Sequence, residues 1–250
     1  MPNLHTLHLS IQTHLTPVPH LEIYNQDEQI HLPLLQDVAI SNVHPRDPFF
    51  ASLPSTLTSL SIRDTPRYYL THDLPPGNTL VGVGELRSLF HPHRFPPLQH
   101  LEIAFVVISD DSFIPEAVYD SVVQSCPNLR SLEINCYHDP LINPSLKRTL
   151  RALNPLKNLR TLRLNLDFPN IDRLEPLQVH GGPGDDDEPT TTRLRLYCIA
   201  KGFPLVHTVA VLTDAVYGVW SEINYTQGPI RGLDWVSDDF SRGYPSLETH

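Results

Sequence analysis

The sequence predicts an α/β fold in which short parallel strands alternate with helices or loops in one elongated array. Two observations predict it: a short apolar phrase returns along the chain, and the segments between its copies carry helical patterns or turn residues. Proline points the same way, because 25 of the 250 residues are proline and many of them stand close before a copy of the phrase.

The repeated phrase is Pro-x-Leu-x-x-Leu-x-Leu, in which Ile or Val replaces some of the leucines. Its last two apolar positions are two residues apart, so on a strand they share one face. The proline ends the preceding helix or loop and favours an extended entry into the strand. Seven complete copies have their first apolar residue at Leu4, Leu35, Leu57, Leu98, Leu129, Leu159 and Val206, and an incomplete one at Leu247. In the copies at Leu57 and Leu159 the proline stands one and two residues further upstream.

This spacing is typical of leucine-rich repeats. One unit cannot bury its apolar face alone, whereas stacked units bury a continuous core behind a parallel sheet. Such repeats usually run about 20–29 residues, and most copies here lie further apart, so we expect insertions. The prediction is a single domain, residues 1–250: an irregular leucine-rich-repeat solenoid with a parallel sheet on its concave face and helices and loops on its convex face.

Several segments between the copies are predicted to be helical. Asp47-Pro48 supplies an N-cap residue followed by proline at the first helical position. Apolar residues at helical spacing mark Phe113–Ser125, a segment starting at Asn143-Pro144, and Thr191–Lys201. An order of strand, helix and strand is the crossover that a parallel sheet requires.

Other segments depart from the repeat. His20–Leu32 alternates around a polar turn, which predicts a hairpin insertion, and Leu70–Val83 is predicted to be a long loop. Residues 181–189 are predicted to form a flexible acidic loop. Residues 216–250, rich in aromatic residues, are interpreted as an atypical C-terminal capping region.

Composition excludes several classes of function. A net charge of −10 disfavours binding to nucleic acid and to anionic membranes. No apolar run approaches the roughly 20 residues that span a bilayer, and Met1–Ser10 lacks the pattern of a secretory signal. Cys126, Cys136 and Cys198 are too few for a disulfide framework, so we expect buried, reduced thiols in an intracellular protein, cytoplasmic or nuclear.

The residues between the inward leucines are predicted to face a protein partner on the concave side, as in other solenoids. The predicted contact residues are His8, Arg63, His100, Glu102, Glu133, Asn135, Arg163 and Asn165. For Glu133 and Arg163 a second interpretation is equally open. The two residues lie on adjacent predicted strands, where they can simply pair with each other across the sheet.

A search for catalytic chemistry finds little. The sequence has no Cys-x-x-Cys pair, no His-Glu-x-x-His motif, no nucleophile elbow and no phosphate-cradling glycine loop. We therefore expect a non-enzymatic protein with no catalytic residue, cofactor or metal. Two alternatives stay open: a metal-dependent hydrolase that uses the region of His91, His93 and His100, and a degenerate gene product without activity.

Three phrases carry a resemblance to a known family: Leu53–Ile62, Cys126–Ile134 and Leu156–Leu164. Through them the sequence resembles the repeat region of fungal F-box proteins with degenerate leucine-rich repeats. The resemblance implies a substrate-recognition subunit of a cullin-type ubiquitin ligase, in which the F-box binds the ligase adaptor and the repeats hold the target. The F-box lies upstream of the repeats in that family, and the first copy here begins at Pro2. An adaptor is therefore expected as a partner only if an F-box precedes this sequence.

Overall fold

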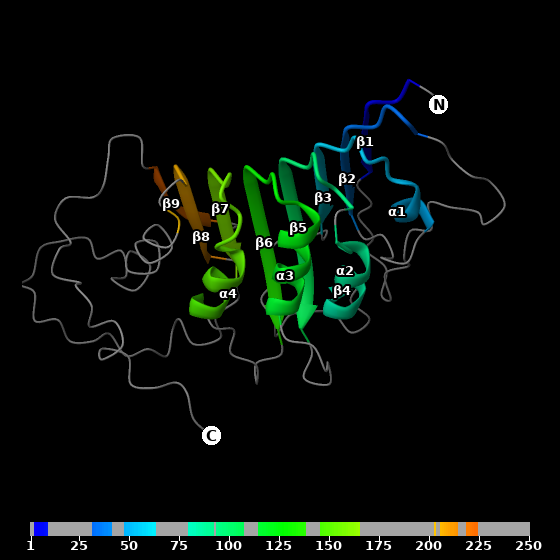
Figure 1. The fold of residues 1–250 in the computed structure, drawn as a ribbon. Coiled ribbons are helices and arrows are strands. Elements are labelled where there is room, and N and C mark those ends of the chain that lie inside the picture. The colour runs from blue at the N-terminus through cyan, green and yellow to red at the C-terminus, as the bar shows by residue number, and fades with distance from the viewer. Residues whose placement is uncertain are drawn as a thin grey trace, which may run out of the picture.

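The computed structural model describes residues 3–9, 32–41, 48–63, 80–92, 94–107, 115–138, 146–165, 203, 206–214 and 219–224. These residues form a nine-stranded sheet with helices packed on one face (Figure 1). The chain therefore has the predicted α/β architecture with a parallel sheet.

Each complete copy of the phrase forms one strand, and the strands lie side by side in chain order. The order is β1-β2-β3-β5-β6-β7-β8-β9, and the short β4 pairs with the far end of β5. Among the described strands every neighbouring pair is parallel except β8 with β9, which is antiparallel. The bounds are Thr6–Leu9 for β1, Asp37–Ser41 for β2, Ser59–Arg63 for β3, Val81–Gly82 for β4, His100–Val107 for β5, Ser131–His138 for β6, Thr161–Asn165 for β7, Thr208–Asp214 for β8 and Val219–Asn224 for β9.

The register pairs equivalent positions of successive copies. Leu101 of β5 faces Leu132 of β6, which in turn faces Leu162 of β7, and all three are buried. A slip by one residue would turn every apolar side chain of a strand toward the opposite face, so burial of this face fixes the register. The spacing within the phrase thus determines both the inward face and the strand pairing.

The same turn precedes most of the strands. The N–H of the first apolar residue donates to the carbonyl three residues earlier, as in Leu129 to Cys126 at 3.3 Å, and proline suits the second position of such a turn. In the copy at Leu159 that second position is Lys157, and Pro155 stands before the turn. The residue that opens the turn is itself apolar and buried in five copies: Leu32, Phe95, Cys126, Leu156 and Phe203.

A second backbone pattern links each copy to the next. The carbonyl of His5 accepts the N–H groups of Gln36 and Asp37, at 2.8 and 3.1 Å. The carbonyls of Gln36, Thr58, Gln99, Arg130 and Arg160 each accept two N–H groups from the following copy in the same way. We name this line of residues the entry row, because it lies where the strands begin. The entry row consists of His5, Gln36, Thr58, Gln99, Arg130, Arg160 and His207.

Helices occupy the returns between the strands. They are α1 (Pro48–Ser52), α2 (Val83–Leu89), α3 (Glu116–Ser125) and α4 (Leu146–Leu153). Helices α2, α3 and α4 lie side by side on one face of the sheet (Figure 1), and α3 contacts both of the others. Helix α1 begins at Pro48 as predicted, and α3 and α4 lie within the predicted helical segments. The fourth predicted helix, residues 191–201, lies outside the described residues.

The predicted long loop at Leu70–Val83 is wrong at its described end. Val81 and Gly82 form β4, whose Val81 pairs with Phe105, and Val83 begins α2. Two glycines in this short stretch weaken any local helix pattern. Tertiary packing nevertheless forms α2, because its residues Val83, Leu86 and Leu89 are buried at helical spacing.

The remaining irregular segments are only partly described. The predicted hairpin, apart from Leu32, and the predicted acidic loop at residues 181–189 lie outside the described residues. Within the predicted capping region, residues 219–224 form β9, which pairs antiparallel to β8 and so ends the parallel series.

The core lies between the sheet and the helices. The inward leucines of the strands pack with the buried residues of α2 and α3, and the rings of Phe105 and Tyr119 meet edge to face with their centroids 6.3 Å apart. Cys126 and Cys136 are buried and are not in a disulfide, as predicted, whereas Cys198 is outside the described residues. Burial raises the pKa of the Cys126 thiol to about 12. None of the helices in the described part of the chain is long and apolar enough to cross a membrane.

Candidate protein-interaction face

The outward residues of the strands form three columns on the sheet face that does not carry α2, α3 and α4. We name this surface the polar face. The register aligns a first column, which consists of Thr6, Asp37, Ser59, His100, Ser131, Thr161 and Thr208. It likewise aligns a central column, which consists of His8, Ala39, Ser61, Glu102, Glu133, Arg163 and Ala210.

Glu102 is held by its neighbours on β3. Its Oε2 accepts hydrogen bonds from Ser61 Oγ at 2.7 Å and from Arg63 Nε at 2.9 Å. The side chain of Glu102 is 15% exposed, whereas that of Arg63 is 44% exposed. The carboxylate is therefore fixed against the sheet, and the guanidinium is the more accessible member of the pair.

Glu133 and Arg163 pair across the sheet, which is one of the two interpretations that the sequence left open. Arg163 Nη1 lies 3.7 Å from Glu133 Oε2, and Asn135 Nδ2 donates to Glu133 Oε1 at 3.2 Å. The side chain of Arg163 is still 39% exposed. Arg163 can therefore pair with Glu133 and still contact a partner with the exposed part of its side chain.

A third column contains Ser41, Arg63, Ala104, Asn135 and Asn165. Apart from Arg63 this column is covered, and this corrects part of the predicted contact surface. Asn135 and Asn165, predicted to meet a partner, are 1% and 5% exposed. They are short side chains on internal strands, flanked by neighbouring strands, and Asn135 lies against the longer Glu133. Ser41 and Ala104 of the same column are also buried. Asn135 and Asn165 are therefore removed from the candidate site.

The two predicted histidines of the site are exposed: His8 is the third residue of β1, and His100 is the first residue of β5. His8 Nε2 lies 3.2 Å from Asp37 Oδ2. No residue of the first column is buried. The accessible part of the polar face therefore lies toward the strand-entry end.

The proposed metal cluster is not assembled by the described residues. His91 and His100 are exposed, and His93 is outside the described part of the chain. Within that part no three His, Cys, Asp or Glu side chains come together in a group that could hold a metal ion. The metal-dependent alternative therefore gains no support from this geometry.

The ion pair of Arg63 with Glu102 is expected to contribute little to stability. In a double-mutant cycle with Arg63→Ala and Glu102→Ala, we expect a coupling of about 1 kcal/mol or less, because Arg63 is solvated. Urea denaturation of the four proteins measures this coupling. A coupling of several kcal/mol would mean that the pair holds the sheet together and is not a surface feature.

Comparison with protein-family models, with curated proteins and with solved structures finds no match to this chain. The candidate site therefore depends on the geometry of this chain alone.

Proposed function

We propose that this chain is an irregular leucine-rich-repeat solenoid that binds a segment of another protein on its polar face, and that it is not an enzyme. The single observation that carries the proposal is the register of seven copies. It aligns polar residues into a continuous first column, none of whose members is buried, and places the charged residues of the central column beside it. Extended faces of this kind are the binding surfaces of solenoid proteins.

The contact set follows from the exposed and half-buried side chains. It retains six of the predicted residues: His8, Arg63, His100, Glu102, Glu133 and Arg163. The guanidinium groups of Arg63 and Arg163 each pair with a neighbouring carboxylate and remain partly exposed. They can therefore donate hydrogen bonds to acidic or carbonyl groups of a partner.

A more specific form of the proposal follows from the family resemblance. In that form the polar face recognises the target of a cullin-type ubiquitin ligase, and an F-box elsewhere in the gene product binds the adaptor. Recovery of a ligase adaptor with the full gene product tests this form separately from the binding of any target.

The proposal is tested by comparing two substitutions on opposite faces. Arg63→Ala alters the polar face, and Arg87→Ala removes an exposed arginine from α2 on the helical face. We expect proteins that the wild-type chain and Arg87→Ala retain from a fungal lysate to be depleted by Arg63→Ala, as measured by quantitative mass spectrometry. Circular dichroism verifies that both variants fold. Identical protein profiles for all three forms would contradict the proposal.

A further inference from the structure

Positive charge is concentrated in one part of this acidic chain. The segment from Arg130 to Arg163 holds seven of the 18 Lys and Arg residues but only two of the 28 Asp and Glu residues. Its net charge is +5, while the remainder of the chain carries −15. Such a segregation of charge creates a local field whose sign differs from that of the whole molecule.

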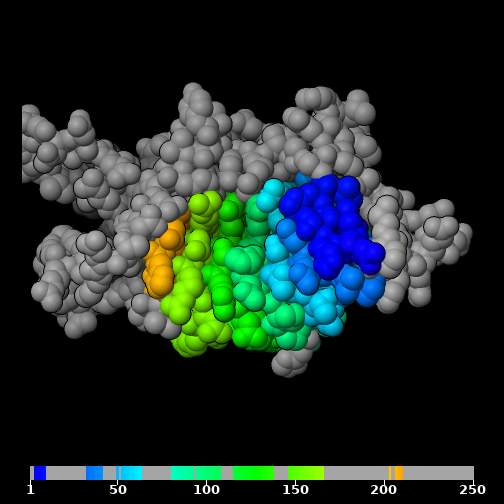
Figure 2. All heavy atoms as spheres, turned by 90° about the horizontal axis from the view of Figure 1, so that it is seen from above, coloured from blue at the N-terminus to red at the C-terminus, as the bar shows by residue number. Residues whose placement is uncertain are grey.

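The fold gathers several of these cations at the strand-entry end of the sheet. Arg130, Arg160 and His207 are consecutive members of the entry row and are exposed. Backbone hydrogen bonds of 2.7 Å join each of them to the next, so these residues directly precede neighbouring strands, which are about 4.8 Å apart. Figure 2 looks onto this end of the molecule, where the copies follow one another in chain order from blue to orange.

Lys157 extends this line onto the adjoining turn. Its Nζ donates to Asn154 Oδ1 at 3.3 Å, and the side chain is exposed. We name Arg130, Lys157 and Arg160 the cationic edge, and the exposed imidazole of His207 lies beside it as the next member of the entry row. The entry row contains no acidic residue, and neither do the turns 126–131 and 154–161 that surround the cationic edge.

We infer that the cationic edge binds an acidic, extended segment of a partner protein, at a surface separate from the contact set of the polar face. Arginine side chains bind carboxylates through two parallel hydrogen bonds, and the spacing of three neighbouring strands presents several donors to one peptide. Carboxylates two residues apart in an extended peptide lie about 6.6–6.8 Å from each other, within reach of these long side chains. A polynucleotide is a poorer match, because the net charge of −10 of the whole chain disfavours a long phosphate backbone.

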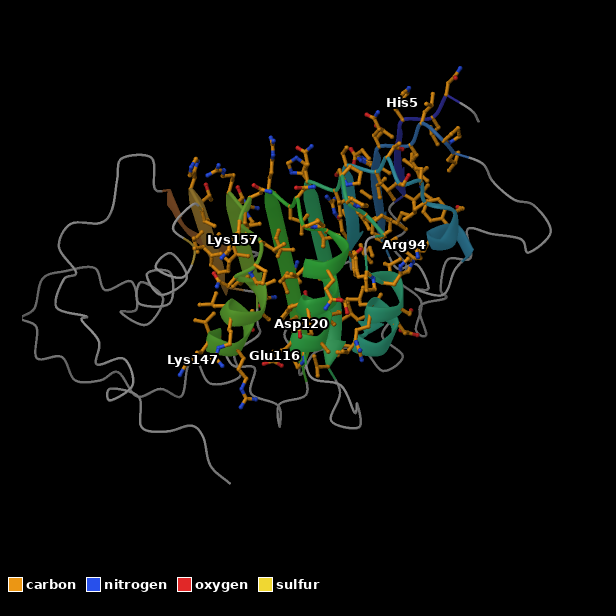
Figure 3. All side chains as sticks on the ribbon, viewed as in Figure 1. His5, Arg94, Glu116, Asp120, Lys147 and Lys157 are labelled. Atoms are coloured by element: carbon orange, nitrogen blue, oxygen red, sulfur yellow. The ribbon has the colours of Figure 1, made fainter. Side chains whose placement is uncertain are left out.

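The chain offers a matched control for this surface. Lys147 lies in the first turn of α4 and Lys157 lies in the turn after α4, so Lys157 is toward the strand-entry end and Lys147 away from it, as Figure 3 shows. Both side chains are exposed. Lys147→Glu and Lys157→Glu therefore change the net charge of the chain equally, but only Lys157→Glu alters the cationic edge.

The test is fluorescence anisotropy with a labelled glutamate-rich peptide and a glutamine peptide of the same length. We expect the full chain to bind the glutamate peptide in low salt and to bind the glutamine peptide at least about tenfold more weakly. Lys157→Glu and the double variant Arg130→Gln/Arg160→Gln should each weaken binding of the glutamate peptide by about tenfold, while Lys147→Glu leaves it unchanged.

Three outcomes would overturn the inference: no binding of the glutamate peptide, an equal loss in Lys147→Glu and Lys157→Glu, or tighter binding of an oligothymidine probe than of the peptide. Circular dichroism of each variant verifies folding, and the milder glutamine variants serve if Lys157→Glu fails to fold. Arg63→Ala, on the polar face, should bind the glutamate peptide normally. If Arg63→Ala alone lost its partner from the lysate but kept the glutamate peptide, the result would bear on the proposed function and leave the inference about the cationic edge intact.

Discussion

Replacing Leu132 with alanine is expected to lower the free energy of unfolding by about 2–5 kcal/mol, measured by urea denaturation. Leu132 is fully buried on an internal strand, between Leu101 of β5 and Leu162 of β7. Alanine removes apolar contact and leaves a cavity that the flanking strands cannot close without changing their register. In an array of this kind each copy depends on its neighbours, so damage at an internal copy affects both sides of it.

Leu34→Ala is the matched control for this experiment. Leu34 belongs to the turn that precedes β2 and is 42% exposed, so the same chemical change should alter stability by about 0.5 kcal/mol or less. An equal loss of stability in the two variants would mean that the side chain of Leu132 is not packed in the core between the sheet and the helices. The register between β5, β6 and β7 would then be wrong.

The parts of this fold that the sequence predicts are those that one local pattern determines. The distance of two residues between Leu132 and Ile134 places both on the inward face. Because every copy repeats this spacing, pairing the copies in chain order also predicts which outward residues align, and Glu133 does lie beside Arg163. The buried residue that opens the turn before a strand, such as Phe95 or Cys126, has a sequence pattern of its own in four copies, since an apolar residue directly precedes the proline there. We call each turn that precedes a strand an entry turn.

The parts that the sequence does not predict depend on contacts between distant residues. Alternation along β6 and β7 places Asn135 and Asn165 on the polar face, but their exposure depends on the strands and long side chains beside them. Helix α2 is short and follows Gly82, so its formation depends on burial of Val83 and Leu86 against the sheet. The cationic edge cannot be predicted without knowing that Arg130 and Arg160 directly precede neighbouring strands, which the register shows.

The entry turn that contains Cys126 should make the fold sensitive to alkaline pH. Burial raises the pKa of this thiol from 9.0 to about 12, because the thiolate cannot be solvated inside the core. Above pH 9 the unfolded chain loses the proton while the folded chain keeps it, so the unfolded state binds fewer protons and stability falls as pH rises. The contribution of the Cys126 thiol to the free energy of unfolding is fully present below pH 9. Each further pH unit should lower the free energy of unfolding by about 1.4 kcal/mol until the pH approaches 12.

The measurement is urea denaturation of the wild-type chain and of Cys126→Ala between pH 7 and pH 10.5. Loss of the buried sulfur lowers the stability of the variant at every pH, but this offset leaves the slope untouched. The difference in slope therefore isolates the thiol from all other groups that titrate in both proteins. Burial also raises the pKa of Tyr119, whose ring packs against Phe105, so Tyr119→Phe should remove a further part of the alkaline loss. Parallel curves for wild type and Cys126→Ala would mean that the thiol reaches solvent. In that case the turn that joins α3 to β6 would not be closed over the core as its hydrogen bonds place it.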